Sequence, residues 1–559
     1  MKVSELDAAL RSLLRPGMAV HLTTQARAAT RAIQRVFRGQ DLRLTLIMGR
    51  IGGGHAADLL ASGLVKHVIA GSYGAVSRQY TGRLPQVQQV YAAGKVTFQH
   101  WTFFSLTQRL MAAAQGMQFV PTHSLAGSTM AAANHDAFIR IPDPFGSGQS
   151  VNLVKALHPD VAILHAVAAD EDGNAILLPP LEEGAWGAKA SKGGVLVTAE
   201  HIVSRATIRK HSHLVKLPGR YVTAVAHVPY GAHPGAFSST ILPDMRSYEE
   251  DEAFNAAYFA ATRDPAALER WVAEWIHGPA SHAAYLEKLG GPRLEQLGLR
   301  GAACTVENGG VETAATSSAA PCTDNERLMT LALRYILRRR AERSYDVFLV
   351  GAGLSEVPAT AAHVLLEEQG IHVDLTMGHG YFGFQPLPGR PNPDASTATM
   401  TTDSPDIYAT ILGGRRGAAL AILGAGQVDR RGNLNSTLIE GNILTGSGGS
   451  NDCAATCDTL VVTRMSRKKL VLQVEYVTCP GDSVHGVVTE CGIFEKSAGG
   501  DLVVTSYMDP DSQGKDAVVD RITRNCGWPA QVANGAHLEV EPSARELALI
   551  RSLMPSRYE

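Results

Sequence analysis

Two stretches carry the pattern that decides the fold: VAILHAVAADEDGNAI at residues 161–176 and LAILGAGQVDRRGNLN at residues 420–435. Each is an apolar run of the kind typical of a buried strand, and each leads into the same D-x-x-G-N turn. The turn aspartates, Asp170 and Asp429, are 259 positions apart (429 minus 170). Self-similarity in a fixed order indicates duplication, so the chain is predicted to contain two related halves, with both aspartates as turn residues.

Outward from these stretches, each half also contains a strand, a glycine turn and a helix in that order. The apolar run at 44–48 precedes a turn at 49–54, and the run at 347–350 precedes Gly351-Ala352-Gly353. Alternating apolar strands and helices are typical of mostly parallel sheets with covered faces, which bind ligands at the carboxyl ends of their strands. We therefore expect an α/β fold of two related open halves.

Between these halves, residues 290–324 lose their apolar periodicity and are rich in Gly, Ala, Ser and Thr. This composition predicts a linker at 291–323, between an N-terminal half at 1–290 and a C-terminal half at 324–559. Thr323 and Glu326 have capping-box spacing, so a helix is expected to begin there. Residues 249–289 read as helices that close the first half.

Composition excludes several classes of protein. The 559 residues are 45% hydrophobic and 19% charged, which is an ordinary globular balance, and 51 Lys and Arg against 53 Asp and Glu leave no basic excess for nucleic acid. Without a secretory leader or a membrane-spanning apolar run, we expect a cytoplasmic protein that does not bind membranes. Cys453 and Cys457 are too few soft ligands for a metal, and no permanently bound cofactor is expected. A homo-oligomer is left open.

Three glycine-rich turns are candidates for ligand binding, because backbone N–H groups at a helix start can hold a phosphate or an oxyanion. They are Gly52-Gly53-Gly54, Gly351-Ala352-Gly353 and Gly446-Ser447-Gly448-Gly449. None completes a phosphate P-loop or a dinucleotide fingerprint. The alternative is that these glycines only permit tight turns.

Longer strings, taken together and in order, are more specific than any single glycine turn. They are GRIGGGHAADLL (49–60), PDVAILHAVAADEDGNA (159–175), VPYGAHPGAF (228–237), VGAGLSEVPATAAHVL (350–365), GAGQVDRRGNLNST (424–437) and TGSGGSNDCAATCDTLVVT (445–463). On these strings the first half resembles the α subunit, and the second half the β subunit, of family I CoA-transferases of the glutaconate type, here joined in one chain.

The resemblance implies an acyl-CoA enzyme with its active site between the halves, where coenzyme A is part of the substrate and a small carboxylic acid is the partner molecule. Gly426 and Gln427 match a family string near the reacting carbonyl, where donors stabilise an oxyanion. Ser72 and Ser128 are loop residues suited to a substrate carboxylate. Asn451 and Asp452 are expected to cap a helix that begins at Cys453.

One departure from the family decides the expected reaction. Ordinary members carry a β-half glutamate that attacks the thioester and then holds CoA covalently. The matching stretch here, LTMGHGYFG at 375–383, has Gly378 and His379 at those positions. A second departure is His100 in FQHW (98–101), where relatives often carry acidic residues. Both histidines are candidate acid or base groups, and the alternative is that they are buried, hydrogen-bonded core histidines.

Since glycine offers no nucleophile, the sequence favours a divergent acyl-CoA enzyme that performs hydrolysis, C–C cleavage or decarboxylation. The first alternative is CoA transfer between an acyl-CoA and a carboxylic acid by a substitute group. The second is a catalytically inactive acyl-CoA or partner-binding protein.

Overall fold

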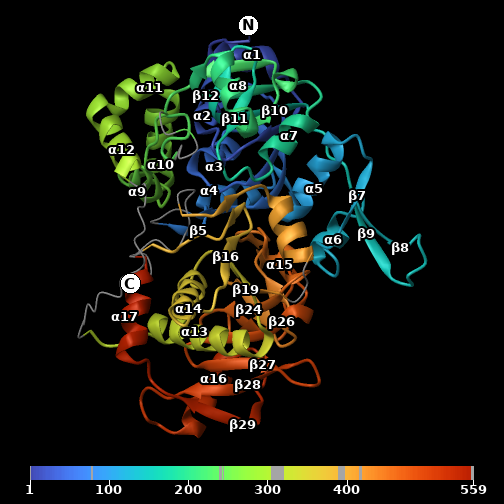
Figure 1. The fold of residues 1–559 in the computed structure, drawn as a ribbon, viewed down its shortest axis with the longest axis vertical. Helices are drawn as coiled ribbons and strands as arrows, with labels where there is room; N and C mark the ends of the chain where they lie inside the picture. The colour runs from blue at the N-terminus through green and yellow to red at the C-terminus, as the bar shows by residue number, and fades with distance from the viewer. Residues whose placement is uncertain are drawn as a thin grey trace.

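The computed structural model describes residues 2–76, 80–237, 242, 245–303, 320–387, 397–414 and 418–555. Figure 1 shows two α/β halves stacked along the long axis, with the first half (blue to green) above the second (yellow to red). Each half has its own twisted, mostly parallel sheet. The predicted fold class is therefore confirmed.

The first sheet runs in the order β13-β11-β10-β1-β2-β3-β6, with β12 and β14 continuing from β10. All its pairings are parallel except those of β11. Its strands are β1 (Ala19–Leu22), β2 (Leu44–Arg50), β3 (Val65–Ser72), β6 (Thr97–His100), β10 (Val161–Asp170), β11 (Ala175–Leu177), β12 (Gly194–Val203), β13 (Val215–Leu217) and β14 (Ala224–His227).

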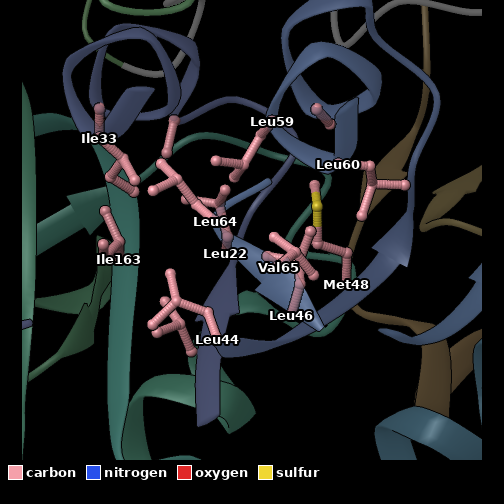
Figure 2. Close-up of a cluster of buried hydrophobic side chains, with 14 of the residues drawn as sticks. Leu22, Ile33, Leu44, Leu46, Met48, Leu59, Leu60, Leu64, Val65 and Ile163 are labelled. Carbon is pink, nitrogen blue, oxygen red and sulfur yellow. The ribbon is translucent and has the colours of Figure 1, made fainter. Parts of the chain in front are cut away.

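Helices cover this sheet and bury its apolar side chains. Figure 2 shows part of the resulting core, where Ile33, Leu59 and Leu60 pack on strand residues such as Leu22 and Leu46. The helices of this half before residue 250 are α1 (Leu6–Leu13), α2 (Arg27–Val36), α3 (Gly54–Ala61), α4 (Pro85–Ala92), α5 (Phe103–Ala114), α6 (Thr129–Ala133), α7 (Gly184–Ala190) and α8 (Arg205–Lys210). Short strands form two further sheets: β4 (Gly74–Val76) with β5 (Thr81–Arg83), and β7 (Phe119–Thr122) with β8 (Phe138–Pro142) and β9 (Ser150–Lys155).

The second sheet runs in the order β18-β17-β16-β15-β19-β24-β26-β27-β28-β29, with a parallel centre from β16 to β26. Its strands are β15 (Val347–Val350), β16 (Asp374–Met377), β17 (Tyr381–Phe382), β18 (Met400–Thr401), β19 (Ala419–Leu423), β24 (Asp458–Val462), β26 (Val484–Thr489), β27 (Gly492–Lys496), β28 (Leu502–Met508) and β29 (Val532–Glu539). The helices of this half are α13 (Asp324–Arg343), α14 (Glu356–Glu368), the π-helix η4 (Asp406–Gly413), α15 (Ser450–Ala454), α16 (Lys515–Asn525) and α17 (Ala544–Leu553), and its short strands are β20 (Gln427–Asp429), β21 (Leu434–Asn435), β22 (Leu438–Ile439), β23 (Asn442–Ile443) and β25 (Leu470–Val471).

The two D-x-x-G-N turns are built alike. The Oδ1 atom of Asp170 accepts hydrogen bonds from the N–H groups two and four residues later, and Asp429 does the same. In each turn the asparagine accepts a further bond from a distant glycine N–H, Gly219 to Asn174 at 2.9 Å and Gly481 to Asn433 at 2.8 Å. Both aspartates are therefore turn residues, and the shared pattern supports a duplicated unit.

Helices at the end of the first half extend into the predicted linker. The expected helices are α9 (Glu252–Ala261), α10 (Pro265–Val272) and α11 (His282–Leu289), and α12 (Gly291–Ala303) takes up the first part of the 291–323 segment. Residues 304–319 of that segment lie outside the described residues. At its far end Thr323 forms the expected capping box with Glu326 and starts α13. No helix in the described ranges is long and apolar enough to span a bilayer.

Candidate active site

A cavity of about 240 Å³ lies at the junction of the two halves. The first half contributes residues from the ends of β2 and β3, from β4 and from the start of α5. The second half contributes the ends of β15, β16 and β19, the residues after them, η4, and the loop that leads into α15. The residues that line the cavity include Arg50, Ser72, Phe103, Gly378, His379, Tyr408, Ser436, Thr445, Gly446, Ser447, Gly448, Gly449 and Cys453. The cavity thus lies at carboxyl ends of parallel strands, as expected for this class of sheet.

The glycine loop at 446–449 forms one wall because backbone hydrogen bonds fix it to the other half. The Gly448 N–H donates to Gly71 at 2.8 Å, and the Gly448 carbonyl accepts from the Phe103 N–H at 2.9 Å. Gly446 adopts φ +80°, and a Cβ there would press against the Gly71 carbonyl. Glycine at these positions therefore serves the close approach of the two halves as well as the cavity wall.

Asn451 and Asp452 do not cap a helix, contrary to the sequence prediction. Helix α15 already begins at Ser450 and has no side-chain cap. Asn451 instead accepts a hydrogen bond from the Leu125 N–H at 2.7 Å, and Asp452 accepts one from the Ser124 hydroxyl at 2.6 Å. Both side chains are buried and bind the other half, because the helix start is pressed against the segment around Ser124.

Arg50 is the cation of the cavity. It stands at the end of β2, and its guanidinium carbon lies 5.4 Å from the centre of the Phe103 ring. Its guanidinium forms no ion pair or hydrogen bond with any described residue. Nearby, burial and the Glu183 carboxylate raise the pKa of Glu182, and Arg50 opposes that shift. A guanidinium without a partner in a cleft is suited to a carboxylate or phosphate of a ligand.

His379 faces the same cavity. Neighbouring atoms desolvate its ring, and this burial together with the charge of Arg50 lowers its pKa to about 3. The ring also makes an edge contact with Tyr381 at 5.2 Å between centroids. At neutral pH the imidazole is therefore uncharged, so it can donate one hydrogen bond and accept one, but it is a weak base.

Gly378 and Gly449 flank the hydroxyl of Tyr408. A Cβ built on either glycine would overlap that hydroxyl. Tyr408 comes from η4 and is almost fully buried, with its hydroxyl end at the cavity. A side chain at position 378 therefore has no space while Tyr408 keeps this orientation.

Of the other predicted site residues, Ser72 lines the cavity, whereas Ser128, Gly426 and Gln427 are not among the residues that line it. Ser72 lines the cavity and donates to the Thr445 carbonyl at 2.9 Å. Ser128 is the N-cap of α6 and makes its hydrogen bonds within that turn. Gln427 bonds Asn435 and Lys468, and a Cβ on Gly426 would press on Leu444.

His100 lies outside the set of residues that line the cavity. Its ring packs against Tyr73 at 5.3 Å and Tyr476 at 6.2 Å between centroids, and burial lowers its pKa to about 4. The Gly52-Gly53-Gly54 turn also lies outside this set. A Cβ on Gly52 would meet the Arg50 side chain, so this turn makes room for that arginine.

Sequence reasoning missed Arg50 and Tyr408. Arg50 stands within the GRIGGG string at the end of a predicted strand, and strand ends are where such sheets bind ligands, so this signal was present. No sequence signal pointed to Tyr408, because its hydroxyl contacts Gly378 and Gly449 only in the tertiary fold. No group of three potential metal ligands occurs in the described part of the chain.

Known proteins with similar sequences include CoA-transferase subunits, a protein with no assigned function and a subunit of a cholesterol ring-cleaving hydrolase from Rhodococcus jostii, which is 27% identical over 202 residues. Residues 3–227 match the family model described as Coenzyme A transferase. The chain is 29% identical over 271 residues to the A subunit of glutaconate CoA-transferase from Acidaminococcus fermentans, a match that covers 45% of this chain and 79% of that protein. It is 34% identical over 242 residues to an uncharacterised protein of Archaeoglobus fulgidus, where the match covers 43% of this chain but only 51% of the archaeal protein.

A solved structure supports the fold of the whole chain. The acyl-CoA transferase from Escherichia coli O157:H7, solved as a thioester complex with CoA, superposes with a TM-score of 0.64 at 16% identity. The match covers 99% of this chain and 98% of the bacterial one. A single chain with both halves is thus an architecture found elsewhere.

Proposed function

We propose that this CoA-transferase-like enzyme binds an acyl-CoA thioester in the cavity between its halves and converts it without a covalent glutamyl carrier. The observation that carries the proposal is the composition of the cavity. It contains a cation, a neutral imidazole, a phenol and several hydroxyls, and none of its described lining residues is an aspartate or glutamate. Such a site can bind a thioester and an anion, but it offers no carboxylate nucleophile at position 378.

The reaction classes that fit are hydrolysis, C–C cleavage and decarboxylation. Hydrolysis passes through a tetrahedral oxyanion, and the two carbon-bond reactions pass through an enolate, so each needs donors at the acyl oxygen. Because the His379 imidazole is neutral, it can donate a hydrogen bond to the acyl oxygen or transfer a proton during the reaction. Gln427, Gly426, His100 and Ser128 stay secondary candidates, since their contacts in the described chain are to protein groups outside the cavity.

Arg50 favours an acyl group, or a second substrate, that carries a free carboxylate. Its guanidinium is partly desolvated and has no described partner, so a carboxylate at this place gains a charge-assisted hydrogen bond. A small carboxylic acid remains the expected partner molecule, and coenzyme A the expected carrier within the substrate.

The test is to incubate the full chain with acetyl-CoA, succinyl-CoA or malonyl-CoA, with and without acetate or succinate as acceptor; malonyl-CoA is the substrate that can lose CO₂ to form a thioester enolate. Thiol release, CO₂ release and new acyl-CoA products are measured in parallel. Turnover without an acceptor acid supports the proposal, whereas products that form only when an acceptor is present support CoA transfer instead. Absence of turnover together with tight CoA binding supports the inactive binding protein.

Arg50→Gln provides a site-specific prediction within this assay. Loss of the charge should raise the KM for succinyl-CoA roughly tenfold or more, with a smaller effect on acetyl-CoA. Arg43→Gln is the matched control, because Arg43 is exposed and, among the described residues, forms its ion pair with Asp41. If Arg50→Gln raised the KM for both thioesters equally, Arg50 would not bind the acyl carboxylate.

Trapping decides between the proposed reactions and CoA transfer by a substitute group. Hydroxylamine or borohydride is added during turnover, and the protein is then analysed by mass spectrometry. A modified carboxylate would contradict the carrier-free reaction, and Glu182 would then be the first residue to inspect because it lies near Arg50.

A further inference from the structure

The hydroxyl of Tyr408 takes the space that a side chain at position 378 would need. Gly378 follows β16, Gly449 precedes α15, and the phenol from η4 enters between them. The three segments are far apart in the chain, yet a Cβ on either glycine would overlap the same oxygen atom. The two glycines and the tyrosine therefore form one unit, in which the phenol replaces the side chain at position 378.

The surroundings of this hydroxyl indicate a ligand. Tyr408 is 3% exposed, and its hydroxyl makes no hydrogen bond to any described residue. The oxygen is not among the fully buried unpaired polar atoms of the described residues, so it is open to the cavity, where a bound ligand can accept its hydrogen bond. The residues around its ring are largely apolar, including Phe104 at 5.8 Å between ring centroids.

The charge state of the phenol is suited to donation. Burial raises the pKa of Tyr408 well above its usual value, as do the neighbouring Cys453 and Asp452, so it keeps its proton at working pH. Its position on a π-helix is also consistent with function, since π-helical turns frequently occur at functional sites.

We propose that the Tyr408 hydroxyl, held between Gly378 and Gly449, donates a hydrogen bond to the acyl oxygen of the bound thioester. This inference rests on the proposed function, because it requires a thioester in the cavity. It also explains Gly378: the position stays without a side chain because the donor occupies that space.

Binding of two ligands that differ in the carbonyl tests the donor directly. Acetyl-CoA has the acyl oxygen, and S-ethyl-CoA, a thioether, does not. The wild-type chain should bind acetyl-CoA about threefold to tenfold more tightly than S-ethyl-CoA, and Tyr408→Phe should abolish this difference. Titration calorimetry measures both affinities.

Tyr335→Phe is the matched control. Tyr335 is also a buried tyrosine whose hydroxyl lies against a glycine, Gly486, and it does not line the cavity. This variant should keep the preference for acetyl-CoA. An unchanged preference in Tyr408→Phe would overturn the inference, as would the absence of any preference in the wild type.

A double-mutant cycle tests the shared space without any ligand. Gly378→Ala should lower the melting temperature by several degrees, because its methyl group collides with the phenol. In the Tyr408→Ala background, Gly378→Ala should lower the melting temperature much less, because the phenol is no longer there. Additive effects would contradict the shared space. If the cycle holds but neither CoA ligand binds, the proposed function fails, and the donor role fails with it.

Discussion

The charge of the cavity depends on single residues, and His379 is a residue whose protonation the fold controls. Its ordinary pKa of 6.5 falls to about 3 through burial and through Arg50. The unfolded chain therefore takes up a proton on His379 below about pH 6.5, while the folded chain does so only near pH 3. Acidification between these values favours the unfolded state.

His379→Gln should consequently reduce the acid sensitivity of folding. From pH 7.5 to pH 5 the wild-type chain should lose up to about 2 kcal/mol more of its unfolding free energy than the variant does. Urea denaturation at the two pH values measures this difference. His372→Gln is the control of opposite sign, since His372 is exposed and Glu367 raises its pKa. An equal acid sensitivity of wild type and His379→Gln would refute the lowered pKa.

At the scale of elements, α15 joins the glycine loop to the other half of the molecule. Asn451 accepts from the Leu125 N–H at 2.7 Å and donates to the Thr478 carbonyl at 2.9 Å, so it connects segments of both halves. Asp452 completes this contact through the Phe104 N–H at 3.1 Å. A helix of five residues thus sets the position of the loop that lines the cavity.

Removal of this contact should destabilise the chain measurably. Asn451→Ala leaves a buried N–H and a buried carbonyl without partners, which should cost about 2–4 kcal/mol in urea unfolding. Asn442→Ala is the control, because Asn442 also bonds the other half, through Gln88, but at an exposed site. Its loss should cost less than about 0.5 kcal/mol. Equal costs would show that α15 does not secure the junction.

In the whole molecule, the two halves share many buried backbone hydrogen bonds. Tyr73 donates to Thr445 at 2.8 Å, and Thr129 donates to Val477 at 2.9 Å. A side-chain bond from Trp186 to Asp403, at 2.8 Å, joins the halves at another place. Each half separated from the other would leave these groups unpaired, so the halves should remain associated without a covalent connection.

A split chain tests this expectation. Residues 1–303 and 320–559, expressed together as two polypeptides, should elute as one complex in size-exclusion chromatography. The same split with Asn451→Ala should dissociate at lower urea concentration. If the two fragments eluted separately while each was folded, the interface between the halves would not be stable without the covalent connection.

Local patterns determined the fold class from the sequence alone. The D-x-x-G-N turns, the strand runs and the Thr323 capping box depend on interactions within a few residues, and each formed as expected. The acyl-CoA class could also be predicted, because ordered family strings extend along both halves. These signals needed no knowledge of how the halves meet.

Only the tertiary structure decided which candidates share the cavity. His379, Ser72 and the 446–449 loop line it, whereas His100 packs among tyrosines and Ser128 caps a helix. Arg50 and Tyr408 were found only in the structure. The physical reason is that the cavity is assembled from strand ends and loops of both halves, separated by hundreds of positions, and no local pattern records which side chains such segments bring together.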